Sequence, residues 1–451
     1  MDLFASKEDL QLTAGSVRGP LFKLAVPVVL ATLLQTVYNL TDTFWVGQYD
    51  STALAALTFS FPLVFLSLAL GGGVSTTGRI LVAQYEGAGD RRDAGVVAGQ
   101  TLTFAVAAAL VVAGLGVVGV PPLLAAAGAG PDVAPLAETY LTYVLAGLPL
   151  LFLAATFSAV LQGYGDTVTP LLVVAASVLL NIVLDPVLVF GLGPVPELGL
   201  RGAAIATLGA RGVAAVAGVW LLVSGRVGPG VPLGDMWPRR AYLARVLRLG
   251  VPASLETTAI AVSVTAMLFV VGRFPEPVVA GFGIGERVLS LMFLPAIGVA
   301  SATTTMVGQN LGADEPERAR RAARIAVGYP LVGLTAVGLL VVAAAPVVAG
   351  VFTPDDAVIG HAAAFLTYTG PAFGLEAALR VYSGVFRGAG RTSVAMVVTG
   401  VAFLPVRLGL ALALVGPLGP TAIWVAYAVS GLLGAGLAAL VARTISWERL
   451  V

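Results

Sequence analysis

The chain has 451 residues, of which 58% are hydrophobic and 11% are charged, and its mean hydropathy is +0.96. Because soluble proteins carry about 25% charged residues, most of this chain is expected to lie in lipid. The net charge of +1 gives no sign of a nucleic-acid partner. The absence of cysteine, together with a single histidine, excludes disulfides, iron–sulfur clusters and Cys/His zinc sites, so no metal site and no cofactor are predicted.

Twelve apolar runs follow one another along the chain, each long enough for a membrane-spanning helix, which needs about 20 residues. They cover 20–45, 54–77, 96–120, 135–160, 168–192, 201–223, 248–272, 278–305, 325–348, 358–385, 393–415 and 420–442. The first run lacks the short apolar core and cleavage site of a signal peptide, so it is expected to be a permanent helix. Since open sheets cannot span lipid, the prediction is an all-α polytopic membrane protein with twelve transmembrane helices.

The distribution of lysine and arginine predicts the orientation of these helices. Most of the 25 basic residues fall in the N-terminal tail and in the connections on the same side, such as 88–95, 224–247 and 313–324. A surplus of basic residues marks the cytoplasmic side. With an even number of spans, both termini are therefore expected to face the cytoplasm, in the cell membrane.

An internal repeat relates the two halves of the chain. The matching segments, 225 residues apart, are FKLAVP (22–27) and LRLGVP (247–252), LVAQYEGAGD (81–90) and MVGQNLGADE (306–315), and LQGYGDT (161–167) and FRGAGRT (386–392). We therefore expect two six-helix lobes, 1–223 and 248–451, joined by a cytoplasmic linker at 224–247. Such parallel repeats are typical of transporters that move two lobes around a central site.

Polar side chains form a stripe in the first apolar run. Gln35, Tyr38, Asn39 and Asp42 have the i, i+3, i+4, i+7 spacing that places them on one face of a helix. A charge at membrane depth costs about 2.5–3.5 kcal/mol, so the acid needs a reason. In the repeat, Asp42 corresponds to Met267, so the architecture itself does not require an acid at this place.

A second acid lies in the fifth run. Asn181 and Asp185 are spaced i, i+4, and Pro186 follows directly and loosens the backbone. The repeat mate of Asp185 is the apolar Leu410, and Thr207 lies near the start of the sixth run. Polar residues that only join helices are expected to be small or scattered. Two carboxylates with two carboxamides and a tyrosine instead favour a wet, protonatable pocket.

Two chemistries fit such a pocket. Burial and a second acid nearby favour the protonated form of a carboxyl group, which can then exchange a proton at physiological pH. Alternatively, oxygen atoms of Asp42, Asn181, Asp185 and Thr207 could hold Na⁺. Either ion, H⁺ or Na⁺, would couple a gradient to a conformational change.

The second half contains three acids at predicted membrane depth, Glu256, Glu286 and Glu376. Arg380 follows Glu376 by four residues, a spacing that permits an ion pair on one helix face. Arg287 adjoins Glu286, so its partner must come from elsewhere, and Glu256 lies near the predicted start of the seventh run. These acids could be structural ion pairs or a second coupling site.

Several segments together resemble the multidrug and toxic compound extrusion (MATE) transporters, in particular the branch found in archaea and many bacteria. They are LLQTVYNLTDTFWVGQ (33–48), VAQYEGAGD (82–90), LQGYGDT (161–167), NIVLDPVLVFGLG (181–193), GAAIAT (202–207), VGQNLGA (307–313) and FRGAGRT (386–392). The resemblance implies a V-shaped pair of six-helix lobes that exports organic cations in exchange for H⁺ or Na⁺.

The resemblance also implies roles for individual residues. Asp42 and Asp185 match the coupling acids of that branch, Tyr38, Asn181 and Thr207 match their partners, and Tyr140 matches a cavity tyrosine. Other branches use carboxylates on the seventh and tenth helices, where Glu256 and Glu376 lie, although not clearly at the family's spacing.

We therefore predict a secondary active antiporter that exports hydrophobic, often cationic compounds, acting as a monomer in the lipid bilayer and not as an enzyme. The alternative is a lipid-linked oligosaccharide flippase of the same superfamily. Its pyrophosphate substrate would call for arginines, whereas only Arg211 is predicted at membrane depth in the first half. The segment LGGGVSTTG (70–78) lacks the lysine of a nucleotide-binding loop, so the energy is expected to come from an ion gradient.

Overall fold

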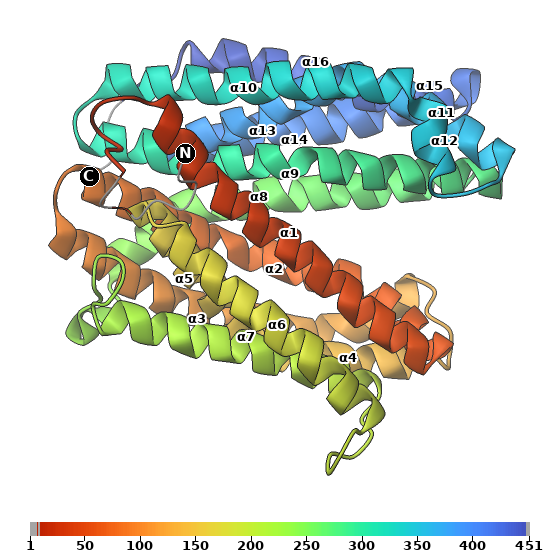
Figure 1. Ribbon diagram of the computed structural model, residues 1–451, viewed down its shortest axis with the longest axis horizontal. Helices are drawn as coiled ribbons and strands as arrows, with labels where there is room; N and C mark the ends of the chain where they lie inside the picture. Colours follow the sequence, from red (N-terminus) through yellow and green to blue (C-terminus); the bar gives the residue numbers. More distant parts are fainter. Residues whose placement is uncertain (1–6, 8–9, 448–451) are drawn as a thin grey trace. The chain divides into compact units, whose positions relative to one another are not determined.

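The computed structural model describes residue 7 and residues 10–447 (Figure 1). Residues 1–6, 8–9 and 448–451 lie outside this part. They include the start of the predicted lobe 1–223 and the end of the predicted lobe 248–451. Every regular element within the described residues is a helix, which confirms the all-α prediction. The chain divides by its contacts into two compact units. The first holds Leu30–Ser254 and the second holds Gln11–Val29 together with the chain from Leu255 onward.

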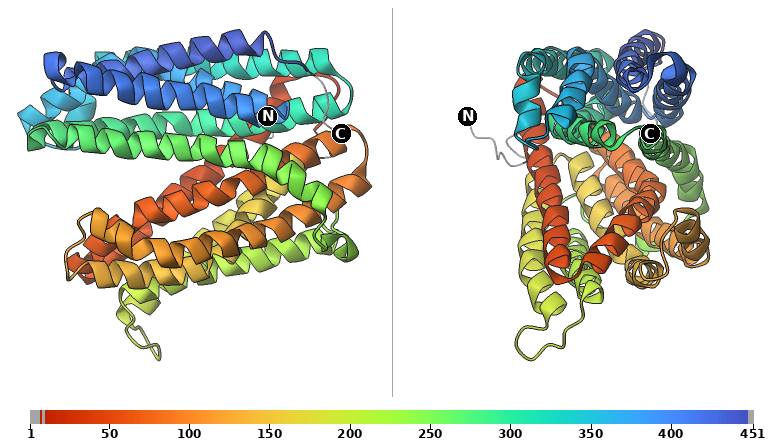
Figure 2. Two further views of the ribbon diagram at one scale, coloured as in Figure 1. Left: turned by 180° about the vertical axis from the view of Figure 1, so that it is seen from behind. Right: turned by 90° about the vertical axis from the view of Figure 1, so that its right-hand side faces the viewer.

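The helices of the first unit lie alongside one another (Figures 1 and 2). They are most of α1 (Arg18–Tyr49), α2 (Ser51–Gly87), α3 (Arg91–Ala126), α4 (Ala134–Ala146), α5 (Leu148–Tyr164), α6 (Val168–Phe190), α7 (Leu200–Val223), the short η2 (Leu233–Met236) and the beginning of α8 (Arg240–Val271). Helix α2 packs against α3 and α5, and α6 packs against α7.

The second unit is a bundle of the same kind. After the remainder of α8 it contains α9 (Glu276–Gly312), α10 (Pro316–Ala343), α11 (Ala345–Gly350), α12 (Asp356–Thr369), η3 (Gly370–Ala372), α13 (Phe373–Gly388), α14 (Thr392–Val401), η4 (Ala402–Leu408), α15 (Gly409–Leu418) and α16 (Thr421–Ala442). Helix α9 packs against α10, α12 and α13, and α13 packs against α16.

All twelve predicted runs fall on helices, but four of them are interrupted, and the run 325–348 is divided at Ala344 between α10 and α11. By length and composition, ten helices in the described residues can cross a membrane, and an eleventh span is the pair α4 and α5, bent by 52°. The run 358–385 is divided by the Pro371-containing turn η3 into two pieces that are individually too short. In the run 393–415, the segment η4 is a π-helix that contains Pro405. Proline removes a backbone donor, which explains these interruptions.

Several helices extend beyond the apolar runs from which they were predicted. Helix α2 continues to Gly87, and α8 begins at Arg240, within the predicted linker 224–247. The rest of that linker is held against α3, because Gln100 on α3 donates to the backbone oxygens of Asp235 and Trp237 and accepts from the backbone N–H of Arg239. The segment is thus an ordered part of the first unit.

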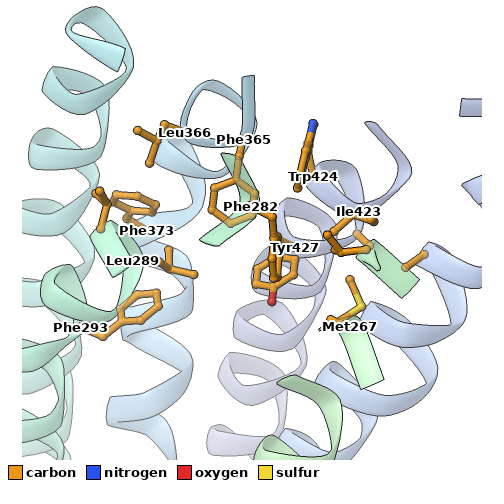
Figure 3. Close-up of a cluster of buried hydrophobic side chains, with 14 of the residues drawn as sticks. Met267, Phe282, Leu289, Phe293, Phe365, Leu366, Phe373, Ile423, Trp424 and Tyr427 are labelled. Atoms are coloured by element: carbon orange, nitrogen blue, oxygen red, sulfur yellow. The ribbon is translucent and has the colours of Figure 1, made fainter. Parts of the chain in front are cut away.

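The core of the second unit is aromatic (Figure 3). Phe282, Phe365, Trp424 and Tyr427 are all at most 2% exposed, and the rings of Phe365 and Trp424 form a T-shaped pair at a centroid distance of 5.1 Å. Offset and edge-to-face aromatic pairs contribute about 0.5–1.5 kcal/mol beyond their buried area. Met267, the repeat mate of Asp42, is completely buried in this cluster. The equivalent position of the second unit is therefore filled by apolar packing.

In the first unit, glycine permits a close approach of α5 to α2. A Cβ atom at Gly163 would lie 2.5 Å from the backbone oxygen of Arg79, so no larger residue fits without a shift. This contact fixes the backbone of α2 at Arg79, in the part of the helix that extends beyond the predicted run.

Candidate ion-coupling and substrate site

The structure buries part of the polar stripe on α1 and the facing residues on α6 and α7. Tyr38 is 3% exposed and Asp42 is 5% exposed, whereas Gln35 and Asn39 are exposed. Asn181 and Asp185 on α6 are completely buried, and Thr207 on α7 and Tyr140 on α4 are also buried. All eight predicted site residues lie in the first unit.

Asp42 and Asp185 are each bonded to an uncharged side chain. The hydroxyl of Thr207 donates to Asp42 Oδ2 at 3.3 Å, and Asn181 Nδ2 donates to Asp185 Oδ1 at 3.1 Å. The two carboxyl groups are neighbours. Within the described residues neither acid is in an ion pair. Three helices thus gather two carboxyls with a hydroxyl and a carboxamide.

Several oxygen atoms of this group have no hydrogen-bond partner among the described residues. They are Asp42 Oδ1, Asp185 Oδ2, Asn181 Oδ1 and the hydroxyl of Tyr38. A buried polar atom without a partner costs about 1–3 kcal/mol, so such a cluster calls for an explanation beyond packing. Unpaired carboxylate and carboxamide oxygens can accept a proton or ligate a hard cation.

A cavity of about 150 Å³, which we call the tyrosine cavity, adjoins these residues. It is lined by Tyr38, Asn39, Asp42, Phe61, Val64, Phe65, Leu68, Tyr140, Val144, Leu151, Thr207 and Arg211. The structure therefore brings five of the eight predicted residues to one cavity, and Asn181 and Asp185 are not among its lining residues. Most of the remaining lining is aromatic or aliphatic.

A second cavity of about 280 Å³, which we call the arginine cavity, holds the eighth predicted residue, Gln35. It is lined by Gln35, Leu68, Arg79, Leu151, Ala154, Ala155, Ser158, Gln162, Val173, Val174, Ser177, Arg211 and Ala214. Leu68, Leu151 and Arg211 line both cavities, so the two adjoin. The guanidinium of Arg211 also lies over the ring of Tyr38, with 4.8 Å from Cζ to the ring centroid.

Arg79, which the apolar run 54–77 left outside a helix, lies on α2 and lines this cavity. The apolar run was taken to end at residue 77, which placed Arg79 in a loop, but α2 continues to Gly87. Sequence reasoning missed it because an arginine ends a hydropathy window without ending a helix. The available signal was the absence of proline or asparagine between Gly78 and Gly87.

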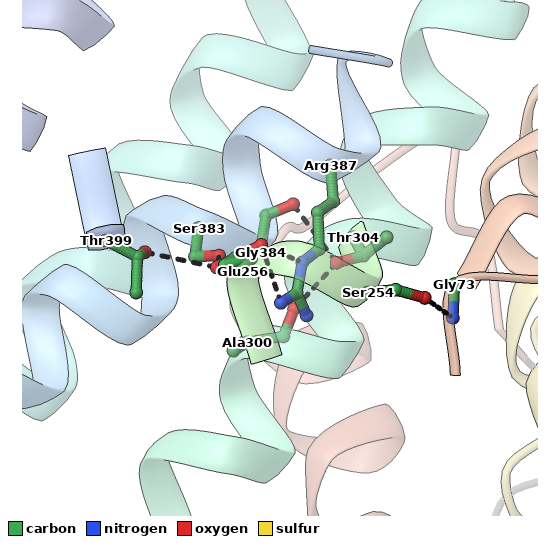
Figure 4. A network of polar contacts seen from close by, with 9 residues as sticks. All are labelled: Gly73, Ser254, Glu256, Ala300, Thr304, Ser383, Gly384, Arg387 and Thr399. Carbon is green, nitrogen blue, oxygen red and sulfur yellow. Dashed lines mark hydrogen bonds and ion pairs between the residues drawn. The ribbon is translucent and has the colours of Figure 1, made fainter. Parts of the chain in front are cut away.

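In the second unit, Glu256 is bonded on both oxygens (Figure 4). Its Oε2 accepts from Arg387 Nη2 at 2.8 Å and from Arg387 Nε at 3.0 Å. Its Oε1 accepts from the hydroxyls of Ser383 and, at 3.1 Å, Thr399. Because α8 begins at Arg240, Glu256 does not lie near a helix start, and this satisfied network on α8, α13 and α14 is the geometry of a structural ion pair.

Glu376 has a different arginine as its main partner from the one that the spacing predicted. Arg380 Nη2 lies 3.7 Å from Glu376 Oε1, whereas Arg407 Nη2 lies 2.9 Å from the same oxygen. Arg407 sits on the π-helical segment η4, donates from Nε to Ser430 at 2.8 Å and lies against the rings of Phe403 and Tyr427. The pair is buried, with Glu376 4% and Arg407 2% exposed.

Glu286, the third acid predicted at membrane depth in this half, forms no ion pair among the described residues. Its Oε1 and the nearby Tyr427 hydroxyl have no hydrogen-bond partner among the described residues. Arg287 is exposed, and no ion pair of it is found in the part of the chain that the structure describes. The expectation that a partner for Arg287 comes from another helix is therefore wrong for the described residues.

A sequence model of the MatE family matches residues 27–187 and again 252–413. The two matches begin 225 residues apart, which is the offset of the internal repeat, and together they cover most of the chain. The chain belongs to the MATE family. MATE proteins from several bacteria are similar to it in sequence. The NorM protein of Deinococcus radiodurans, named a probable multidrug resistance protein, is 32% identical over 92% of this chain and 93% of its own length.

Two further relatives differ in their names. The probable multidrug resistance protein NorM of Thermotoga maritima is 26% identical over 96% of this chain and 94% of its own length. A protein of Shewanella oneidensis, named an FAD transporter, is 30% identical over 75% of this chain and 75% of its own length. This MATE chain is thus similar both to proteins named for multidrug resistance and to one named an FAD transporter.

Solved MATE structures have the same fold. A crystal structure of a MATE protein in complex with MaL6 has a TM-score of 0.88 at 26% identity and covers 96% of this chain and 97% of its own. A transporter from Pyrococcus furiosus has a TM-score of 0.88 at 27% identity and covers 96% of both chains. The description of that structure states that a reversed polarity of the binding pocket suggests a different function.

Proposed function

We propose that this MATE protein is a secondary active multidrug antiporter that exports hydrophobic, often cationic compounds in exchange for H⁺ or Na⁺. The observation that carries the proposal is the pair of neighbouring acids Asp42 and Asp185. Both are buried in a membrane-spanning bundle, both have uncharged hydrogen-bond partners, and each retains an unpaired oxygen. Gain or loss of one cation there changes the charge of the site. A coupled transporter needs two conformations that bind the ion with different affinity, and this change of charge can supply that difference.

The tyrosine cavity supports the proposed substrate class. Its lining combines the rings of Tyr38, Phe61, Phe65 and Tyr140 with the carboxyl group of Asp42. Aromatic faces attract cations and cover apolar surface, and a carboxylate adds opposite charge. A volume of about 150 Å³ is smaller than the 300–1,000 Å³ typical of drug sites. The tyrosine cavity would therefore bind one part of a larger substrate molecule.

The residues present fit either coupling ion. Asp42 Oδ1, Asp185 Oδ2 and Asn181 Oδ1 are unpaired oxygens on neighbouring side chains, and the Thr207 oxygen lies beside Asp42. For H⁺, Asp42 and Asp185 would hold the proton. For Na⁺, these oxygens would serve as ligands, with Asn181 Nδ2 still bonded to Asp185.

We further propose that the six-helix lobes 1–223 and 248–451 are the moving parts and that the ordered segment 224–247 connects them. Both termini would face the cytoplasm, and the protein would act as a monomer. The distribution of basic residues and the two family matches support this arrangement.

The test is uptake by everted membrane vesicles of a cationic dye such as rhodamine 123, under an imposed pH gradient with and without Na⁺. Because eversion places the cytoplasmic face outside, accumulation of the dye in the vesicles that is driven by one of the two gradients supports the proposal and names the ion. Vesicles that transport the dye under neither gradient, with the protein present in the membrane, would contradict it.

The lipid-linked oligosaccharide flippase remains the second candidate because Arg79 and Arg211 line one cavity. Two arginines can bind a pyrophosphate. The volume of about 280 Å³ accommodates a small anionic group but not an oligosaccharide. The cation antiporter therefore fits better.

A further inference from the structure

Another cavity, of about 460 Å³, lies within the second unit, which does not contain the coupling acids. We call it the terminal cavity, because residues that follow the last helix help to form it. Helices α10 and α13 pack against each other, and so do α13 and α16. The cavity lies at the end of this bundle where α10 begins and where α13 and α16 end. It is lined by Arg320, Ala323 and Arg324 of α10, Tyr382 and Val385 of α13, Ala439 and Ala442 of α16, and Arg443, Ile445 and Trp447.

The segment 443–447 forms one wall of the terminal cavity and is held in place by both polar and apolar contacts. Arg391 donates from Nη2 to the hydroxyl of Ser446. The side chains of Ile445 and Trp447 pack against a buried cluster contributed by α9, α10 and α13. The Cζ atom of Arg320 lies 5.8 Å from the centroid of the Trp447 ring. Three helices and an anchored segment therefore shape this cavity.

The charges that line the terminal cavity are all positive among the described residues. Arg320 is paired with Glu317, which lies outside the lining. Arg324 and Arg443 form no ion pair within the part of the chain that the structure describes, and both are exposed. A planar guanidinium pairs with two oxygens of a phosphate group. The cavity therefore offers two available arginines to a phosphate-bearing ligand.

The surface beside the cavity favours a lipid over a soluble phosphate compound. Helix α16 is apolar and long enough to cross a membrane. Leu433, Leu440 and Arg443 lie on one face of it, and the two leucines are 51% and 62% exposed. This apolar stripe leads to Arg443 and can accept an acyl chain. Tyrosine and tryptophan, which line the cavity as Tyr382 and Trp447, are enriched where a membrane meets water.

We propose that the terminal cavity binds the headgroup of an anionic phospholipid, with its phosphate at Arg324 and Arg443 and an acyl chain along Leu440 and Leu433. This site goes beyond the proposed antiport and does not depend on it. The cavity lies at the end of the unit that is rich in arginine, for which we have proposed a cytoplasmic location. Basic pockets between membrane helices on that side bind phosphate headgroups.

The test is native mass spectrometry of the purified full chain in detergent with equal amounts of dioleoylphosphatidylglycerol and dioleoylphosphatidylcholine. The two lipids have the same chains, but only the first has a net negative charge. We expect the wild type to bind more phosphatidylglycerol. The variant Arg324→Gln/Arg443→Gln should lower the ratio of bound phosphatidylglycerol to phosphatidylcholine by about five for each arginine, and so about 25-fold. Arg324→Lys/Arg443→Lys, which keeps both charges, should retain most of the preference.

Arg248→Gln/Arg321→Gln is the matched control. It also removes two exposed arginines, and neither of them lines the terminal cavity. This variant should leave the lipid ratio unchanged. Size-exclusion chromatography checks that each variant is folded, and a ratio measured within one preparation cancels differences in yield. A third probe, glycerol 3-phosphate, carries the phosphate without acyl chains and should not displace an equal concentration of phosphatidylglycerol.

Three results would overturn the lipid site. The first is a wild-type protein that binds the two lipids equally, and the second is a preference that Arg324→Gln/Arg443→Gln retains in full. The third is an equal loss in the control variant, which would show that the total charge, and not this cavity, selects the lipid. Displacement of phosphatidylglycerol by glycerol 3-phosphate would likewise reject the lipid and indicate a soluble phosphate compound.

Discussion

Two buried acids of the first unit and two of the second differ in the chemical nature of their hydrogen-bond partners. In the first unit, Asp42 and Asp185 are bonded to a hydroxyl and a carboxamide and retain unpaired oxygens. In the second unit, Glu256 and Glu376 are each bonded to an arginine. An arginine partner compensates the buried charge and occupies the carboxylate, whereas a neutral partner leaves the carboxylate available to an ion. Burial alone therefore does not identify a coupling acid, but the type of partner distinguishes the two groups.

The largest expected effect is the loss of efflux in Asp42→Asn. The substitution keeps the shape of the side chain and the contact with Thr207 but removes the group that binds H⁺ or ligates Na⁺. Transport of rhodamine 123 into everted vesicles should fall to near background at a normal protein level. Asp132→Asn, which changes an exposed acid in a turn, is the control and should be silent. Full efflux by the Asp42 variant would show that the acids of the first unit do not couple an ion to transport.

The next effect concerns stability in the second unit. Glu376→Gln removes the negative charge opposite Arg407, and leaving a buried cation without its partner costs roughly 3–5 kcal/mol. The midpoint of thermal unfolding in detergent, followed by tryptophan fluorescence, should therefore fall strongly. Adding Arg407→Gln should recover part of the loss, and more than adding Arg380→Gln, because Arg407 is the closer partner. A stable but inactive Glu376→Gln protein would place a second coupling acid in this unit.

Glu286→Gln is expected to have a smaller effect. The Oε1 atom of Glu286 makes no hydrogen bond among the described residues. The free energy of unfolding should therefore change by less than about 1 kcal/mol, the size of one neutral hydrogen bond. Efflux should be retained, because no second acid without an arginine partner lies beside Glu286, in contrast to the pair Asp42 and Asp185. Efflux as low as that of Asp42→Asn would contradict the view that the coupling acids lie in the first unit alone.

The smallest expected change is the one between Asp42→Asn and the double variant Asp42→Asn/Asp185→Asn. Neighbouring acids titrate as a pair, so the second substitution should add nothing to the worse of the two single losses. Efflux rates of the three variants are compared in the same vesicles. Losses that multiply strictly would indicate that the two acids act at separate sites.

The polar stripe on α1 was predictable because a helix places residues at i, i+3, i+4 and i+7 on one face, and this local rule needs no knowledge of the rest of the chain. The pairing of Asn181 with Asp185 follows from the same rule. The pairing of Glu376 with Arg407 does not, because 31 residues separate them and Arg407 lies on a π-helical segment. Local spacing favoured Arg380, which is the more distant partner.

The location of Arg79 and the breaks at Gly147 and η3 were also not predictable from apolar runs. A predicted apolar run ends where charged residues begin, whereas a helix ends where its backbone can no longer continue, as at Gly87. Prolines lie at or beside the breaks in the runs 135–160, 325–348, 358–385 and 393–415, but proline is common within membrane helices. Its presence does not say which helices are broken.

The central claim, that Asp42 couples an ion to transport, is tested most directly by measuring ion movement driven by the substrate. Proteoliposomes receive a gradient of rhodamine 123 and no ion gradient, and internal pH and ²²Na⁺ uptake are followed together. The account predicts that the wild-type protein moves one of the two ions opposite to the dye and that Asp42→Asn moves neither. Ion counterflow of wild-type size in Asp42→Asn would contradict the account.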